Sequence, residues 1–186
     1  MSLIKRALSL IGLSPKPSVQ PAIAPSRPTP VVESEPAATI QPGVTPLEPT
    51  VVQQMEDLRQ MIIGGLAATG LSKDVDHDSI LHGLDEMVAM SIITGEKTSL
   101  STAAGILFGD AMASDLGWQW GFYRDAQGTA LVIHDPTKGE LDMKAFPIDA
   151  IHKRLSSGER FTFGQVRQSL VGAAQAMIAK HQAETA

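Results

Sequence analysis

The stretch that most constrains the fold is residues 105–120, where a helical pattern ends at a glycine and a strand pattern begins. Before Gly117, apolar residues recur at the spacing of one helix face. After it, Trp118, Trp120 and Phe122 recur at every second position, as on a strand with one buried face. The sequence therefore predicts a helix that ends near Gly117 and leads directly into a strand.

Proline marks the part of the chain that we expect to lie outside the folded domain. Ten of the twelve prolines precede residue 50, and residues 14–50 contain no aromatic residue and no periodic apolar face. Such a segment cannot bury enough apolar surface to offset the entropy lost on ordering. We predict a disordered, proline-rich linker over residues 14–50 and a single globular domain over residues 51–186.

The first thirteen residues form a separate amphipathic segment. A helix here would place Leu3, Ile4, Leu8 and Ile11 on one broad apolar face, with the basic pair Lys5-Arg6 opposite. We interpret residues 1–13 as a docking motif for a protein partner. A weak membrane-surface anchor, a short secretory signal and an unstructured terminus are the alternatives. We expect a cytoplasmic protein, which in the second of these interpretations contacts the inner membrane surface peripherally.

Charge and cysteine content exclude several classes of function. Residues 51–186 carry 11 Lys and Arg against 17 Asp and Glu, so the domain is acidic and a poor match for nucleic-acid phosphates. The sequence has no cysteine, which excludes thiol nucleophiles, disulfides and iron–sulfur clusters. Asp74, Asp76 and Asp78 are spaced like the start of a calcium loop, but the glycine and the bidentate glutamate that such a loop needs are missing. We therefore expect no metal, no cofactor and no nucleic-acid partner.

Periodicity predicts a mixed α+β domain. We expect a helical layer packed on a three-stranded antiparallel meander. A turn at 125–128 joins the first two strands, and Pro147 suits the first turn of a helix. The expected helices begin at residues 51, 72, 98 or 99, 147 and 163, and the expected strands cover residues 118–123, 129–134 and 141–146.

Three sequence pieces, in this order, resemble a known family. They are Gly105-x-x-Phe-Gly-Asp110, Leu116-Gly-Trp-x-Trp120, and the run from Phe146-Pro147 to Gly158-Glu159. The combination resembles the uncharacterised bacterial domain-of-unknown-function family numbered 3806, over about residues 87–163. The resemblance implies a bacterial origin and a small α+β domain, and it assigns no catalytic residue.

Candidate chemistry is sparse. His134 and Asp135 follow a predicted strand, where a general base could act, and Asp110 lies near the end of the preceding helix and could face the same sheet. Asp135-Pro136 is also a common turn opener, which explains the pair without chemistry. Trp118 and Trp120 are core residues if their face meets the helices and interaction residues if it is exposed.

The sequence therefore favours a non-enzymatic interaction or accessory module, tethered by the linker to whatever residues 1–13 bind. The alternative is a small hydrolase or ligand-binding enzyme that uses Asp110, His134 and Asp135. Whether the protein is an enzyme stays open at this point, with the balance toward a binding role.

Overall fold

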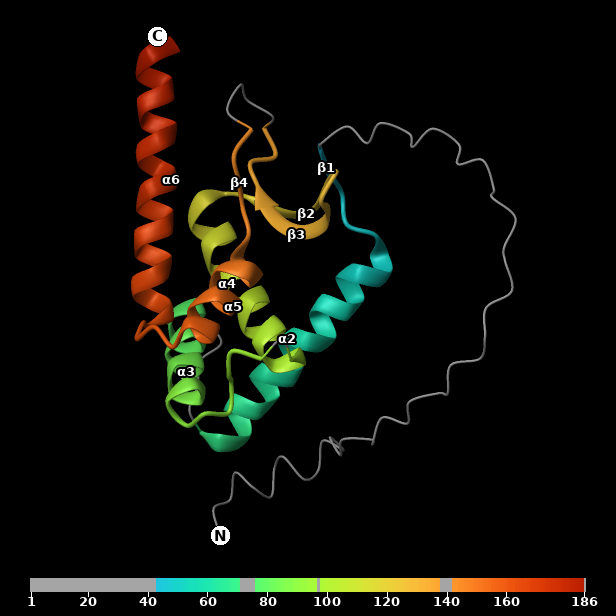
Figure 1. Cartoon of the computed structure of the whole chain (residues 1–186), viewed down its shortest axis with the longest axis vertical. Helices are drawn as coiled ribbons and strands as arrows, with labels where there is room; N and C mark the ends of the chain where they lie inside the picture. The colour runs from blue at the N-terminus through green and yellow to red at the C-terminus, as the bar shows by residue number, and fades with distance from the viewer. Residues whose placement is uncertain (1–42, 71–75, 97, 138–141, 186) are drawn as a thin grey trace, which may run out of the picture. The chain divides into compact units, whose positions relative to one another are not determined.

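Five helices and four strands build the domain in the computed structural model, which describes residues 43–70, 76–96, 98–137 and 142–185 (Figure 1). The predicted docking motif and most of the predicted linker lie outside these ranges. The mixed α+β class is confirmed. The elements are, in chain order, β1 (Gly43–Thr45), α2 (Pro49–Thr69), α3 (His77–Ala89), α4 (Ser99–Leu116), β2 (Gln119–Asp125), β3 (Gly128–His134), β4 (Lys144–Ala145), α5 (Pro147–Ser157) and α6 (Phe163–Thr185).

Helix α4 is the centre of the domain. The other four helices all pack against it, and Ala104, Phe108 and Ala111 have no exposed surface. Small residues on α4 let the neighbouring helices approach closely, while Phe108 fills the space between them and meets the Phe163 ring edge to face, 6.0 Å between centroids. The helix begins with a reciprocal cap between Thr98 and Ser101 and ends at Gly117, which adopts φ 68°. Both predicted ends of this helix are confirmed.

The sheet is antiparallel throughout, in the order β1-β2-β3-β4. Trp120 lies opposite Ile133 in the β2–β3 hairpin, and both side chains pack on the helical core. The predicted hairpin over residues 118–134 is confirmed, because the Asp125-to-Gly128 turn closes it. The Asp125 carboxylate accepts hydrogen bonds from the backbone N–H groups of Gln127 and Gly128, which fixes that turn.

The predicted strand count of three is corrected to four. The additional strand, β1, lies inside residues 14–50, which we predicted as linker, and α2 also begins there, at Pro49. Val44 is the one apolar side chain of β1, and it covers Gly121 on β2. A Cβ atom at Gly121 would lie 2.6 Å from the Val44 Cγ1 atom. A strand of three residues is too short to produce an alternating pattern, so periodicity could not reveal it.

None of the helices in the described part of the chain is both long enough and apolar enough to span a membrane.

Candidate functional site

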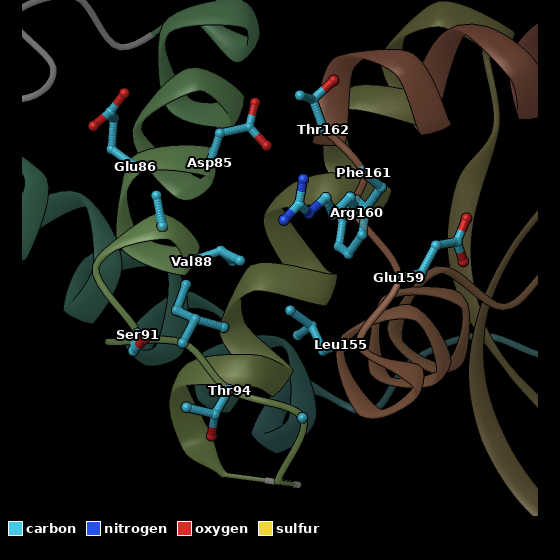
Figure 2. Close-up of a pocket in the computed structure, with 14 residues that line it drawn as sticks. Asp85, Glu86, Val88, Ser91, Thr94, Leu155, Glu159, Arg160, Phe161 and Thr162 are labelled. Atoms are coloured by element: carbon cyan, nitrogen blue, oxygen red, sulfur yellow. The ribbon is translucent and has the colours of Figure 1, made fainter.

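A pocket of about 590 Å³ opens between the end of α3, the loop to α4, the end of α5 and the loop to α6 (Figure 2). We call it the α3–α5 pocket. Five apolar side chains and two threonines line it together with three carboxylates and one guanidinium. The lining residues that carry side-chain chemistry are Asp85, Glu86, Val88, Ser91, Ile93, Thr94, Leu155, Glu159, Arg160, Phe161 and Thr162.

The α3–α4 loop gives the pocket a fixed wall. Ser91 adopts φ 57°, an uncommon conformation for a residue other than glycine. Gly95 lies directly against the end of α5, where a Cβ atom would come within 2.6 Å of the Ser156 Cα atom. The Ser156 hydroxyl donates a hydrogen bond of 2.7 Å to the Gly95 carbonyl. This close approach joins the two sides of the pocket and requires glycine at position 95.

Asp85 forms the acidic side of the pocket and also holds α6 in place. Its carboxylate accepts a hydrogen bond of 2.8 Å from the backbone N–H of Phe163, the first residue of α6. Burial raises the pKa of Asp85 above its usual range, although the hydrogen bond from Phe163 acts in the opposite direction. Glu86 is the next residue, so two carboxylates lie at this edge of the pocket.

Arg160 forms the basic side. Figure 2 shows its guanidinium pointing into the space between α3 and the α5–α6 loop. Within the described ranges, Arg160 makes no ion pair, and its side chain is exposed. Its five N–H groups are therefore available to a carboxylate or a carbonyl oxygen of a ligand.

The apolar part of the lining lies beside these charged side chains, around Val88 and Leu155 (Figure 2). Ile93 is almost fully buried, whereas Val88, Leu155 and Phe161 are half-buried and pack on the core. Phe161 also contacts the Phe163 ring edge to face, with 5.5 Å between centroids. A partly apolar pocket lined by charged side chains of both signs can bury an apolar group of a ligand while polar groups are held at its rim.

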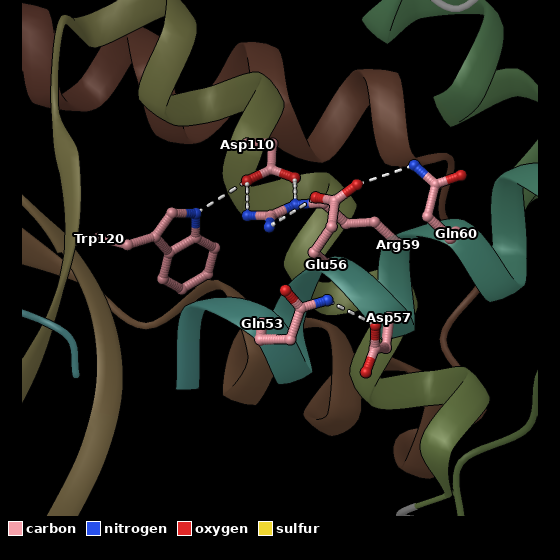
Figure 3. Close-up of polar contacts among 7 residues, drawn as sticks. All are labelled: Gln53, Glu56, Asp57, Arg59, Gln60, Asp110 and Trp120. Atoms are coloured by element: carbon pink, nitrogen blue, oxygen red, sulfur yellow. Dashed lines mark hydrogen bonds and ion pairs between the residues drawn. The ribbon is translucent and has the colours of Figure 1, made fainter. Parts of the chain in front are cut away.

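Asp110, a predicted site residue, lies outside this pocket and joins three elements. Its carboxylate receives two hydrogen bonds from Arg59 on α2, at 2.7 and 2.8 Å, and a third from the indole N–H of Trp120, at 2.8 Å (Figure 3). The hydrogen bond with Asp110 is the main cause that raises the pKa of Arg59. Both Asp110 oxygens accept hydrogen bonds from other elements, so this carboxylate connects α2, α4 and β2 and serves a structural role.

His134 and Asp135 are not brought together with Asp110. The His134 ring lies on the face of the sheet toward which a side chain at Gly121 would point. The residue before Gly121, Trp120, points to the other face and reaches Asp110. Adjacent strand residues face opposite sides of a sheet, so Asp110 and His134 are separated by the sheet. The Asp135 carboxylate accepts two hydrogen bonds from Thr137, which lower the pKa of Asp135 and form a turn. This placement gives no support to the hydrolase alternative.

The predicted interaction residues divide into two groups. Trp118 belongs to the core with 8% of its surface exposed, and Trp120 is half-buried and bonded to Asp110. Both tryptophans therefore follow the core interpretation. Leu3, Ile4, Leu8 and Ile11 lie outside the described residues. No group of three or more His, Asp or Glu side chains in the described part of the chain is placed to hold a metal ion.

A buried polar pair was missed by the sequence analysis. Ser101 on α4 is fully buried, and its hydroxyl lies 3.1 Å from Nε2 of His152 on α5. The Ser101 oxygen also accepts from the Thr98 N–H and donates to the Glu96 carbonyl, at 2.9 and 2.8 Å. A hydroxyl has one proton, so when Ser101 donates to the Glu96 carbonyl, His152 donates to Ser101 through Nε2. The pair connects α4 to α5 beneath the surface.

Arg160 and Asp85 were also missed, because neither belongs to a recognisable catalytic or ligand motif. The one signal near the pocket was the run that ends at Gly158-Glu159, which adjoins Arg160. Asp85 falls where a calcium loop beginning at Asp74 would need its bidentate glutamate, and that spacing gives no indication of the pocket. Its contact with Phe163 spans 78 positions of sequence, which no local pattern reveals.

Part of the folded domain matches a known family model. Residues 81–166 match the model of DUF3806, described as a domain of unknown function. Every residue lining the α3–α5 pocket lies within the matched residues.

A solved structure shares the fold. The crystal structure of a protein from Bacteroides thetaiotaomicron VPI-5482, at 1.50 Å resolution, superposes with a TM-score of 0.60 at 14% sequence identity. The likeness covers 74% of this chain and 50% of the other, so this chain spans about half the length of that protein. At this identity the likeness concerns the fold alone. The search of curated proteins finds no match.

Proposed function

We propose that the protein is a non-enzymatic interaction module that binds a short peptide segment of a partner protein in the α3–α5 pocket. The observation that supports this proposal most strongly is the exposed guanidinium of Arg160, which forms no ion pair within the described residues and lines a partly apolar pocket together with Asp85 and Glu86. A peptide offers an apolar side chain, backbone carbonyls and charged groups together, which this lining complements.

The predicted docking motif at residues 1–13 completes the proposed arrangement. A second weak contact through a flexible tether raises the overall affinity for a partner without any new contact in the folded domain. In this proposal the linker holds the docking motif and the pocket on one chain, so that both engage the same assembly. If residues 1–13 instead contact a membrane surface, the linker would hold the pocket near that surface in the same way.

The pocket is tested with a peptide library displayed on phage and panned against the full chain. Arg160→Glu reverses the charge that we assign to the ligand contact, and Arg124→Glu makes the same change at an exposed position of β2 outside the pocket. We expect peptides selected on the wild type to lose at least about tenfold in affinity for Arg160→Glu and to bind Arg124→Glu unchanged. Absence of selected peptides, or equal binding to both variants, would contradict the proposal.

The docking motif is tested separately by removing residues 1–13. We expect the shortened chain to keep the same unfolding midpoint, since none of these residues belongs to the described helices and strands. It should also keep its affinity for the selected peptides while losing retention of the protein at its cellular partner, measured by fractionation of cells that express each form. Equal fractionation of the two forms would remove the tether from the proposal and leave the pocket standing.

A further inference from the structure

A second cavity, of about 460 Å³, lies between α5 and α6. We call it the α5–α6 groove. Both helices pack on α4, and Met112 of α4 forms part of its lining. Strand β4 leads directly into α5 at this place (Figure 1), so that Lys144 and Phe146 also line the groove. The volume lies in the range of about 300–1,000 Å³ that small-molecule sites occupy.

Positive charge gathers in this groove although the chain as a whole is acidic. Lys144, Lys153 and Arg154 line it, against the single carboxylate of Asp149. Asp142 pairs with Lys144 and offsets one of these charges, which leaves a local excess of one positive charge in a chain whose formal net charge is −5. Such a local field attracts small anions, which the remaining surface repels.

Two of the three cations are free to contact a ligand. The third, Lys144, already contacts other residues of the chain. Its ammonium lies 2.6 Å from the Asp142 carboxylate and 4.8 Å from the centre of the Tyr123 ring. Arg154 uses one N–H group to reach the Ala150 carbonyl of its own helix and keeps the others. Neither Lys153 nor Arg154 forms an ion pair within the described residues.

The rest of the groove is apolar. Met112 is 1% exposed, and Phe146 and Leu170 are half-buried. Ala145, Pro147 and Ala150 complete the lining with small apolar surfaces. An inorganic anion would leave the exposed parts of Phe146, Leu170 and the two alanines in contact with water, whereas a ligand with an apolar body would cover them.

We propose that the α5–α6 groove binds a small organic carboxylate with an apolar body, whose carboxylate lies against Lys153 and Arg154 and whose body lies against Met112, Phe146 and Leu170. Arg154 can hold a carboxylate through two parallel hydrogen bonds, and Lys153 adds a point charge beside it. This site is independent of the proposed peptide contact, because the groove and the α3–α5 pocket share no lining residue.

Titration calorimetry on the full chain tests the proposal with three defined probes. Octanoate supplies both the charge and the apolar body, octanamide supplies the body alone, and inorganic phosphate supplies the charge alone. We expect saturable binding of octanoate at millimolar concentration and at least tenfold weaker binding of the other two probes. Raising the salt concentration should weaken octanoate binding, since the contact includes exposed charges.

Matched variants locate the site. Lys153→Gln with Arg154→Gln removes two charges from the solvent side of α5, and we expect octanoate affinity to fall about tenfold or more. Lys180→Gln removes an exposed charge on α6 outside the groove and should leave affinity unchanged. Leu170→Asn should lower the affinity for octanoate without raising the affinity for phosphate. Each variant is accepted only if its unfolding midpoint matches that of the wild type.

Three results would overturn the proposal. The first is no saturable octanoate binding by the wild type. The second is equal affinity for two of the probes. Equal affinity for octanoate and octanamide would mean that the charge does not contribute to binding, and equal affinity for octanoate and phosphate would mean that the apolar body does not. The third is unchanged octanoate affinity in the double variant at positions 153 and 154, which would place any binding elsewhere on the chain.

Discussion

At the scale of single residues, Asp110 joins three elements of the fold through its carboxylate. It accepts hydrogen bonds from both Arg59 and Trp120, and its side chain keeps 19% of its surface exposed. A bidentate, partly dehydrated pair is stronger than an ion pair in open water, since the solvent screens it less. Asp110 should therefore contribute to stability.

A double-mutant cycle measures this contribution. We expect Asp110→Ala alone to lower the free energy of unfolding by about 2 kcal/mol, because it leaves Arg59 and the Trp120 indole without their acceptor. The coupling between Arg59→Gln and Asp110→Asn should reach at least about 1 kcal/mol in urea denaturation. The control pair, Lys180 and Glu184, is highly exposed and should couple by about 0.3 kcal/mol. Equal coupling in the two cycles would show that Asp110 has no special part.

Asp85 makes the stability of the domain depend on pH. Its pKa is raised in the folded state by burial, so the folded chain binds a proton at higher pH than the unfolded chain does. The stabilisation by this protonation is present at low pH and is lost as pH rises from about 3.8 through the raised folded-state pKa.

Asp85→Asn tests this dependence while keeping an oxygen that can accept from the Phe163 N–H. We expect the wild type to lose stability relative to Asp85→Asn between pH 4 and pH 7, in urea denaturation at each pH. Asp85→Ala should be the least stable of the three at both pH values, because it leaves that N–H without its partner. A difference between the wild type and Asp85→Asn that does not change with pH would refute the assigned cause.

At the scale of elements, the sequence predicted those whose ends carry a chemical signal. Thr98 and Gly117 bound α4, and Pro147 and Gly158 bound α5, because capping side chains and left-handed glycines act locally. β1 was missed because three residues give no period. Its partner strand, β2, is more than 70 residues away, and only the folded chain brings Val44 against Gly121.

Removal of β1 measures what this short strand contributes. We compare chains that begin at residue 41 and at residue 47, the second of which lacks the whole strand. The shorter chain should be less stable by about 1–2 kcal/mol, because β2 loses its hydrogen-bonded neighbour and Gly121 loses the cover of Val44. Equal unfolding midpoints for the two chains would mean that β1 adds nothing to the fold.

The candidate site was less predictable than the fold for a physical reason. Asp85, Ser91 and Arg160 come from a helix, a loop and a second loop, and the folded chain alone brings them to one pocket. Sequence reasoning instead selected Asp110 and His134, which are residue types suited to catalysis. The structure places these on opposite sides of the sheet, where Asp110 is saturated by Arg59 and Trp120.

At the scale of the whole molecule, two recesses of the described domain differ in their chemistry. The α3–α5 pocket combines carboxylates with one guanidinium, and the α5–α6 groove carries an excess of positive charge. Neither recess has Arg59, Asp110 or Trp120 among its lining residues, and these three residues hold α2, α4 and β2 together. Binding at the recesses can therefore be altered by mutation without removing the contacts that hold the fold.

The most direct test of the proposed interaction module is a nuclear magnetic resonance titration of the full chain with a selected peptide. Our account predicts that the largest amide shifts fall in residues 85–95 and 158–162, and that Arg160→Glu abolishes them while Arg124→Glu does not. Shifts concentrated elsewhere on the domain, or equal shifts in both variants, would contradict the assignment of the α3–α5 pocket as the binding site.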